Sequence, residues 1–282
     1  MALGEKRSTG FYLLTAIFIA FLIFLYGPVI TIGILSFQGP TGGLTFPMQG
    51  TSMHWFGELF RTQMVGDIWG SFQRSIILGL TVMVITVVFS VGAGMAYRKK
   101  FFGSTPLFYL IIASLVIPSI LVSLGVGLIF SQLGWEVHWS TSGLGAQLTW
   151  TLPFGILIMF AVFNRFDKAY EEAGRDLGAG PFQVFRLIVL PIIAPSLIGV
   201  ALFGFTLSYD EFARTLLTSG SRNTLPLEIF GMTTNVTTPV IYALGTLTTL
   251  FSLLIIIFFL TFFVLSQRRR NKKGSDAGKG LV

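Results

Sequence analysis

Thiol chemistry and charge are scarce in this sequence. Its 282 residues include no cysteine, which excludes disulfide bonds, thiolate metal sites and thiol-based catalysis. Charged residues make up 11% of the chain, against about 25% in a typical soluble domain. The two histidines, His54 and His138, lie between the long apolar stretches. A hydrolase acting inside a membrane needs a serine with a base, paired aspartates or metal ligands at that depth, and the apolar stretches contain no such set.

Long uncharged runs are abundant instead. Mean hydropathy is +0.78, and six runs reach the length of about 20 residues that a helix needs to cross a bilayer. The runs are solidly apolar and do not alternate, so they predict helices rather than barrel strands. We therefore expect an all-α integral membrane protein with one transmembrane domain, 1–267, and a basic cytoplasmic tail, 268–282. The six predicted spans are 11–37, 75–97, 104–131, 142–164, 190–209 and 240–266.

Basic residues fall in alternate connections between the predicted spans. The N-terminus, residues 98–100, residues 165–186 and the tail hold 15 of the 19 lysines and arginines. Connections rich in basic residues stay in the cytoplasm, so both termini and the segment 167–190 are expected there. Topology and contact with anionic membrane lipids account for the net charge of +7, and no nucleic-acid partner is expected.

The first half of the segment 167–190 predicts a short amphipathic helix. Asp167 can cap a helix that begins at Lys168, and Glu171 precedes Arg175 by the four residues that suit an ion pair. Three apolar residues recur at intervals of three and four, which places them on one narrow stripe. They are Tyr170, Ala173 and Leu177.

The second half predicts a turn and another helix. Gly178 and Gly180 permit left-handed backbone that ends the first helix, and Pro181 suits the first position of a second helix, 181–189. From these residues alone, the segment fits a connector lying on the membrane surface as well as it fits a docking element for a cytoplasmic partner.

The stretch "EEAGRDLGAGPFQVFRLIVLP" resembles the EAA loop of bacterial ABC-importer permeases of the binding-protein-dependent type. That loop has Glu-Ala-Ala, a glycine four residues after the second alanine, and a distant Ile-x-Leu-Pro. Gly174 departs from it, because the family usually has its second alanine there. The resemblance implies the type I, MetI-like permease architecture. The matching residues are Glu172, Ala173, Gly178, Ile188, Leu190 and Pro191.

The resemblance also implies a role for this loop. In such permeases it forms coupling helices that sit in a cleft of a separate ATPase dimer and transmit its closure to the membrane. The apolar stripe would then pack into the ATPase, Glu172 would pair or cap at the contact, and Gly178 would give the sharp turn. The chain has no Walker A pattern, so no cofactor is expected in it, and ATP with Mg would bind to the partner ATPase.

Most of the chain loosely, and residues 170–250 closely, resemble polyamine (spermidine/putrescine) importer permeases, especially the second of their two permeases. The resemblance rests on "TLSYDEF", "SGSRNTLPLEIFGM" and "NVTTPVIYALGTL". It implies a homologous second permease in a heterodimeric pore, a periplasmic or lipid-anchored solute-binding protein, and location in the bacterial inner membrane.

An acidic pair ends the predicted span 190–209. Carboxylates at membrane depth are costly and often functional, and they would attract a cationic amine with Tyr209 offering a cation–π contact. The candidate substrate path is Ser208, Tyr209, Asp210 and Glu211. Alternatively, Asp210 or Glu211 simply pairs with Arg214 at a helix end. Opines, aminophosphonates and amino-acid-like solutes remain alternative substrates, and a stand-alone secondary transporter is a further alternative.

Overall fold

Helices form almost all of the regular structure in the computed structural model, which describes residues 8–61, 66–99, 101–235 and 238–277. Across these ranges the only β pairing is an isolated bridge between Gln38 and Thr51. The longer helices are α1 (Thr9–Leu35), α4 (Ile68–Tyr97), α5 (Ser104–Val116), α6 (Ser119–Gln132), α7 (Leu144–Asn164), α10 (Leu190–Tyr209), α11 (Leu225–Asn235) and α12 (Val240–Ala277). The shorter ones are α2 (His54–Glu58), α8 (Ala169–Asp176), α9 (Pro181–Val184) and the π-helical η1 (Trp139–Gly143) and η2 (Phe185–Val189).

The chain forms two compact units, and α11 and α12 are divided between them. The first unit combines the chain up to Gly66 with Gly231–Phe251. Its loop after α1 folds around the buried side chain of Gln38, which accepts a hydrogen bond from Gln49 N at 2.7 Å and donates one to Gly43 O at 3.2 Å. Tyr242 Oη donates to Leu44 O at 2.6 Å and ties α12 to this loop.

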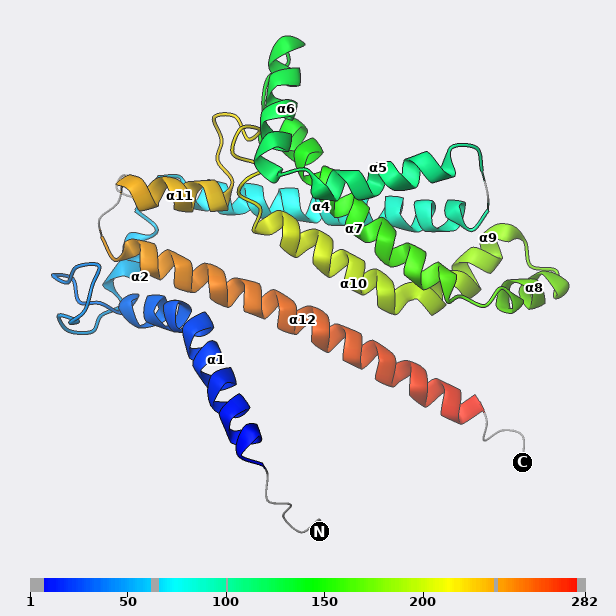
Figure 1. Cartoon of the computed structure of the whole chain (residues 1–282), viewed down its shortest axis with the longest axis horizontal. Helices are drawn as coiled ribbons and strands as arrows, with labels where there is room; N and C mark the ends of the chain where they lie inside the picture. The colour runs from blue at the N-terminus through cyan, green and yellow to red at the C-terminus, as the bar shows by residue number, and fades with distance from the viewer. Residues whose placement is uncertain (1–7, 62–65, 100, 236–237, 278–282) are drawn as a thin grey trace. The chain divides into compact units, whose positions relative to one another are not determined.

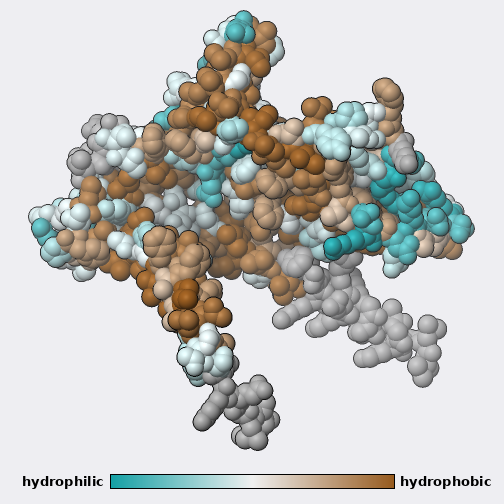
Figure 2. Space-filling model, viewed as in Figure 1, coloured by the Kyte–Doolittle hydropathy of each residue, from teal (hydrophilic) through white to brown (hydrophobic). Residues whose placement is uncertain are grey.

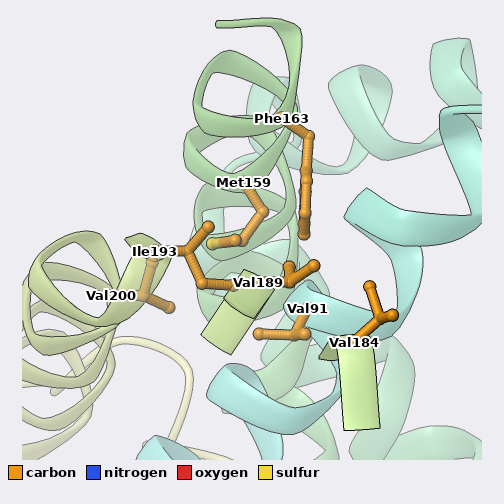
Figure 3. Close-up of a cluster of buried hydrophobic side chains, with 7 residues drawn as sticks. All are labelled: Val91, Met159, Phe163, Val184, Val189, Ile193 and Val200. Carbon is orange, nitrogen blue, oxygen red and sulfur yellow. The ribbon is translucent and has the colours of Figure 1, made fainter. Parts of the chain in front are cut away.

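The second unit, Asp67–Phe230 with the chain from Ser252, is built on α4, α7 and α10, which pack against one another (Figure 1). Gly94 allows α4 to approach α7 closely, since a Cβ there would lie 2.7 Å from Phe163 Cδ2 and 3.0 Å from Met159 Cβ. Figure 3 shows the apolar core that results. It consists of Val91, Met159, Phe163, Val184, Val189, Ile193 and Val200.

Five helical segments of the described chain are long and apolar enough to cross a membrane, and they overlap predicted spans one, two, four, five and six. The predicted span 104–131 is instead two helices, α5 and α6, bent by 107°. Pro118 causes the break because it lacks an N–H donor and disfavours helical backbone in the residue before it. Ile117 accordingly has extended backbone, at φ −68° and ψ 126°. The count is five spans, or six if the bent pair forms one.

The predicted helix 181–189 is not separate from the fifth span. α9, η2 and α10 form one unbroken helical segment, Pro181–Tyr209, of 29 residues. Val184 and Val189 lie in its first turns and are buried in the core, at 3% and 1% exposure. The second half of the segment 167–190 is therefore joined rigidly to the packed helices.

Candidate functional sites

The first short helix forms, beginning one residue later than predicted. α8 begins at Ala169, whose N–H donates to Asp167 Oδ1 at 2.9 Å, so Asp167 supports the first turn. Glu171 and Arg175 approach within 3.6 Å across one turn, which confirms the predicted ion pair. Glu171 and Glu172 both lie in the first turn, where the helix dipole favours negative charge.

The turn after α8 depends on one glycine. Gly178 has φ +83° and donates its N–H to Arg175 O at 2.8 Å, so a left-handed residue ends the helix as predicted. The same expectation for Gly180 is wrong, because its φ is −69° and it caps α9 from extended backbone. Gln183 Oε1 accepts from Gly180 N at 2.9 Å, and Pro181 opens α9 as predicted.

The apolar stripe of α8 faces outward. Tyr170 is 56% exposed, Leu177 is 89% exposed and Ala173 is also exposed. Phe182 and Leu187 add further exposed apolar surface on the next helical segment. We call Tyr170, Ala173, Leu177, Phe182 and Leu187 the coupling surface. Figure 2 shows hydrophilic residues gathered at the end of this unit where α8 lies.

Gly174 has a packing role that explains its departure from the family pattern. It is the buried residue of α8, and a Cβ there would lie 2.4 Å from Ile188 Cδ1. The structure thus brings Gly174 and Ile188 together beneath the exposed stripe. Glu172 is exposed, and Leu190 and Pro191 begin α10.

An ion pair joins α8 to α4. Arg98 Nη1 donates to Glu171 Oε1, and both side chains are 13% exposed. The guanidinium also lies 5.4 Å and 5.3 Å from the ring centroids of Phe163 and Phe166, within the range of a cation–π contact. Sequence reasoning missed this link, because the two charged residues are 73 positions apart and no local spacing relates them.

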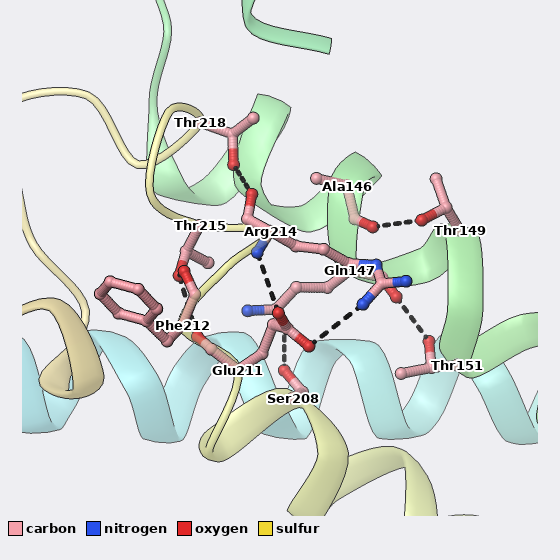
Figure 4. Close-up of polar contacts among 10 residues, drawn as sticks. All are labelled: Ala146, Gln147, Thr149, Thr151, Ser208, Glu211, Phe212, Arg214, Thr215 and Thr218. Carbon is pink, nitrogen blue, oxygen red and sulfur yellow. Dashed lines mark hydrogen bonds and ion pairs between the residues drawn. The ribbon is translucent and has the colours of Figure 1, made fainter. Parts of the chain in front are cut away.

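A second ion pair lies just after the other end of α10 (Figure 4). Arg214 Nη1 is 3.3 Å from Glu211 Oε2, and Arg214 N donates to Glu211 Oε1 at 2.9 Å. Both side chains are buried, at 5% and 8% exposure, and the guanidinium lies 4.5 Å from the Trp150 ring centroid. Burial lowers the pKa of Arg214, and the charge of Glu211 opposes that shift. Glu211 thus takes the local pairing that the sequence offered as an alternative.

The other candidate path residues differ in accessibility. The Ser208 hydroxyl is buried and donates to Gln147 Oε1 on α7. Tyr209 is buried and its ring stacks on Phe205 with centroids 5.8 Å apart. Asp210, at the C-cap of α10, is exposed. Sequence reasoning missed Gln147, although an amide within an apolar span is a signal that could have found it.

Side chains of α4, α6 and η1 hold the loop after α10 in place. Ser123 Oγ accepts from Leu217 N at 2.9 Å, and Ser142 Oγ donates to Thr218 O at 2.8 Å. Ser75 Oγ accepts from Leu225 N at 2.8 Å. Three backbone groups, Leu217 N, Thr218 O and Leu225 N, are thereby satisfied inside the protein, as buried backbone requires.

Residues 87–272 match the family described as the binding-protein-dependent transport system inner membrane component, and this chain belongs to that family. It is a multi-pass membrane protein of a family of transport permeases rather than enzymes. One relative is the spermidine/putrescine transport system permease protein PotC of Haemophilus influenzae, 29% identical over 86% of this chain and 93% of its own. Another is the putrescine transport system permease protein PotI of Escherichia coli K12, 31% identical over 79% of this chain and 81% of its own.

Solved structures share the fold at lower identity. A bacterial ABC transporter that imports the acidic polysaccharide alginate has a chain with a TM-score of 0.70 and 16% identity, covering 93% of this chain and 98% of its own. A chain of the MetNI methionine ABC transporter has a TM-score of 0.56 and 17% identity, covering 77% of this chain and 99% of its own. These likenesses confirm the predicted MetI-like helical architecture.

Proposed function

We propose that this chain is a permease subunit of an ATP-driven importer for spermidine, putrescine or a related polyamine. It contributes half of the translocation pore in the bacterial inner membrane, beside a homologous second permease. An ATPase dimer binds on the cytoplasmic side, where ATP and Mg are held, and a solute-binding protein delivers substrate from outside. Both termini lie in the cytoplasm under this proposal.

The observation that carries the proposal is the coupling surface. Apolar side chains such as Tyr170 and Leu177, exposed on a water-facing segment, indicate a surface that a partner covers. Burial of each such side chain stabilises a complex by about 1.5–3 kcal/mol. The left-handed turn of this surface is formed by Gly178, at the position of the glycine of the EAA pattern. The helical segment that follows the turn continues into α10. The closed ATPase dimer would bind the outward-open permease more tightly than the other state, so closure of the dimer would favour the outward-open state.

The substrate proposal rests on the names of the relatives and on Asp210. Glu211 is neutralised by Arg214, whereas Asp210 is an exposed residue at the end of α10. A polyamine carries several ammonium groups, and an accessible carboxylate attracts them electrostatically. Tyr209 and Ser208 are buried beside it and would position the end of α10. The neighbour that imports alginate has the same fold, so the fold does not determine the solute.

Reconstitution tests both levels of the proposal. The chain is assembled in proteoliposomes with its second permease, ATPase and solute-binding protein, and uptake is measured for labelled putrescine and spermidine beside an opine, an aminophosphonate and amino acids. We expect ATP-dependent uptake of the polyamines. Uptake of another class would overturn the substrate while preserving the importer, and uptake without the ATPase would overturn the importer.

Asp210→Asn sharpens the substrate proposal. Loss of the carboxylate should lower polyamine uptake by about tenfold, the worth of roughly 1.4 kcal/mol, with unchanged ATP hydrolysis. Asp67→Asn is the control, since Asp67 is another exposed carboxylate, which caps α4 and pairs with Arg74, and Asn also serves as a cap. Equal uptake by the Asp210 and Asp67 variants would remove Asp210 from the path.

A further inference from the structure

A second feature lies beside the coupling surface and is distinct from it. A cavity of about 730 Å³ opens between the ends of α4, α5 and α7. Its described lining includes three basic residues, Arg98, Lys99 and Lys168, and no acidic residue. Hydroxyl groups of Ser104 and Thr105 and the amide of Asn164 add hydrogen-bonding capacity, while the Tyr97 hydroxyl donates to Ser104 O. The apolar wall is formed by Phe108, Phe160, Phe163 and Phe166.

We propose that this cavity binds the headgroup of an anionic phospholipid. Arg98 is already paired with Glu171, so the two lysines supply the available charge. Lys99 and Lys168 are both exposed, and no ion pair engages either one within the described part of the chain. Two ammonium groups lining one cavity with hydroxyl donors match a phosphate diester, which presents negative oxygens as acceptors.

The start of α5 adds to this positive field. Its N-cap is Gly103, with φ +85° and no capping side chain, and its first turn contains no acidic residue. Ser104 and Thr105 of that turn line the cavity. Within the described residues, neither the cap nor the first turn of α5 supplies a negative charge, so the positive end of the helix dipole favours an anion there.

The surroundings favour a lipid over a soluble phosphate compound. Phe102, in the α4–α5 turn, is fully exposed, and Tyr109 in the cavity wall is 66% exposed. Aromatic side chains at the level of the headgroups anchor proteins in the membrane interface. Leu107 and Leu110 of α5 are also exposed, next to the cavity. A headgroup in the cavity would leave its acyl chains against this apolar side of α5, as in basic lipid pockets between membrane helices.

Native mass spectrometry of the detergent-solubilised complete complex tests the site. Phosphatidylglycerol is titrated against phosphatidylcholine, and we expect retained phosphatidylglycerol on the wild type. Each basic residue near an anionic surface contributes about a fivefold affinity, so K99Q/K168Q should weaken binding about 25-fold. R165Q/R186Q is the matched control, because it removes two exposed charges that do not line the cavity.

A second variant separates space from charge. Ala161 lines the cavity from α7, so Ala161→Trp should fill it and reduce phosphatidylglycerol binding with all lysines present. Equal binding of the two lipids, or equal losses in R165Q/R186Q and K99Q/K168Q, would overturn the site. Displacement by inorganic phosphate or glycerol phosphate at the lipid's own concentration would assign it to a soluble ligand. Retention of the lipid by the permease pair without its ATPase, but not by the complete complex, would assign the cavity to a protein contact.

Discussion

The two ends of the continuous segment Pro181–Tyr209 differ in what they do with charge and apolar surface. Near α8, an Arg–Glu pair joins two distant elements, and apolar side chains face outward. After Tyr209, an Arg–Glu pair is local and buried, and serine hydroxyls of other helices satisfy the loop that contains it. Under the proposed function a partner covers the first end, whereas the second end takes its ion pair and several of its hydrogen bonds from the chain itself. Mutations at the two ends should therefore fail differently.

The largest effect on stability is expected at the end after Tyr209. Glu211→Ala leaves Arg214 buried without its counter-charge, and breaking a buried pair in this way costs about 3–5 kcal/mol of unfolding free energy. Thermal unfolding of the purified complex measures the loss. The double variant Glu211→Ala/Arg214→Met should recover at least half of it, because no buried charge remains. A loss below about 1 kcal/mol for the single variant would contradict the pairing.

Gly178→Pro should weaken binding of the ATPase rather than the stability of the folded chain. Proline cannot adopt φ +83° and removes the N–H that Arg175 O accepts, at a local cost of about 3 kcal/mol. We expect retention of the ATPase on purification to fall by about 100-fold, with little change in the unfolding temperature of the core. Gly180→Ala is the matched control, since its φ of −69° suits any residue. Wild-type retention by Gly178→Pro would refute the docking role.

Arg98→Ala should lower both the unfolding temperature and the retention of the ATPase, because the ion pair of Arg98 with Glu171 joins α8 to α4. It leaves Glu171, 13% exposed, without its main partner, at a cost of about 1–3 kcal/mol. Unfolding temperature and ATPase retention should fall together. Arg98→Lys keeps the charge and should restore part of both, since it loses the planar contact with Phe163 and Phe166. A fall in stability alone would show that α8 docks without this anchor.

Gly174→Ala should have the smallest effect. Alanine improves helix propensity by about 1 kcal/mol, and the contact of its Cβ with Ile188 Cδ1 offsets that gain. Adding Ile188→Val removes the contacting methyl, so the double variant should unfold at a higher temperature than the Ile188→Val single variant. Stabilisation by Gly174→Ala alone would show that the side chain of Ile188 moves aside freely.

The sequence predicted those features that depend on composition and close spacing. Membrane spans follow from uncharged length, and the turn at Gly178 follows from a glycine placed after a short periodic helix. The bend at Pro118 did not follow, because neighbouring helices decide whether a proline kinks a span or breaks it. The contacts Arg98–Glu171 and Gln147–Ser208 join residues far apart in the chain. Glu211–Arg214 was foreseeable as an alternative because the two residues are one helical turn apart.

The continuity of Pro181–Tyr209 gives the proposed importer a stiff rod with a fixed pivot. Val184, Val189, Ile193 and Val200 hold it in the core, and about 14 Å of helix extends from Val200 to Tyr209. A tilt of roughly 10° about Val200 would displace the far end by about 2 Å. A small rotation received at Phe182 would thus move Asp210 by about the length of a bond or two, without unwinding the helix.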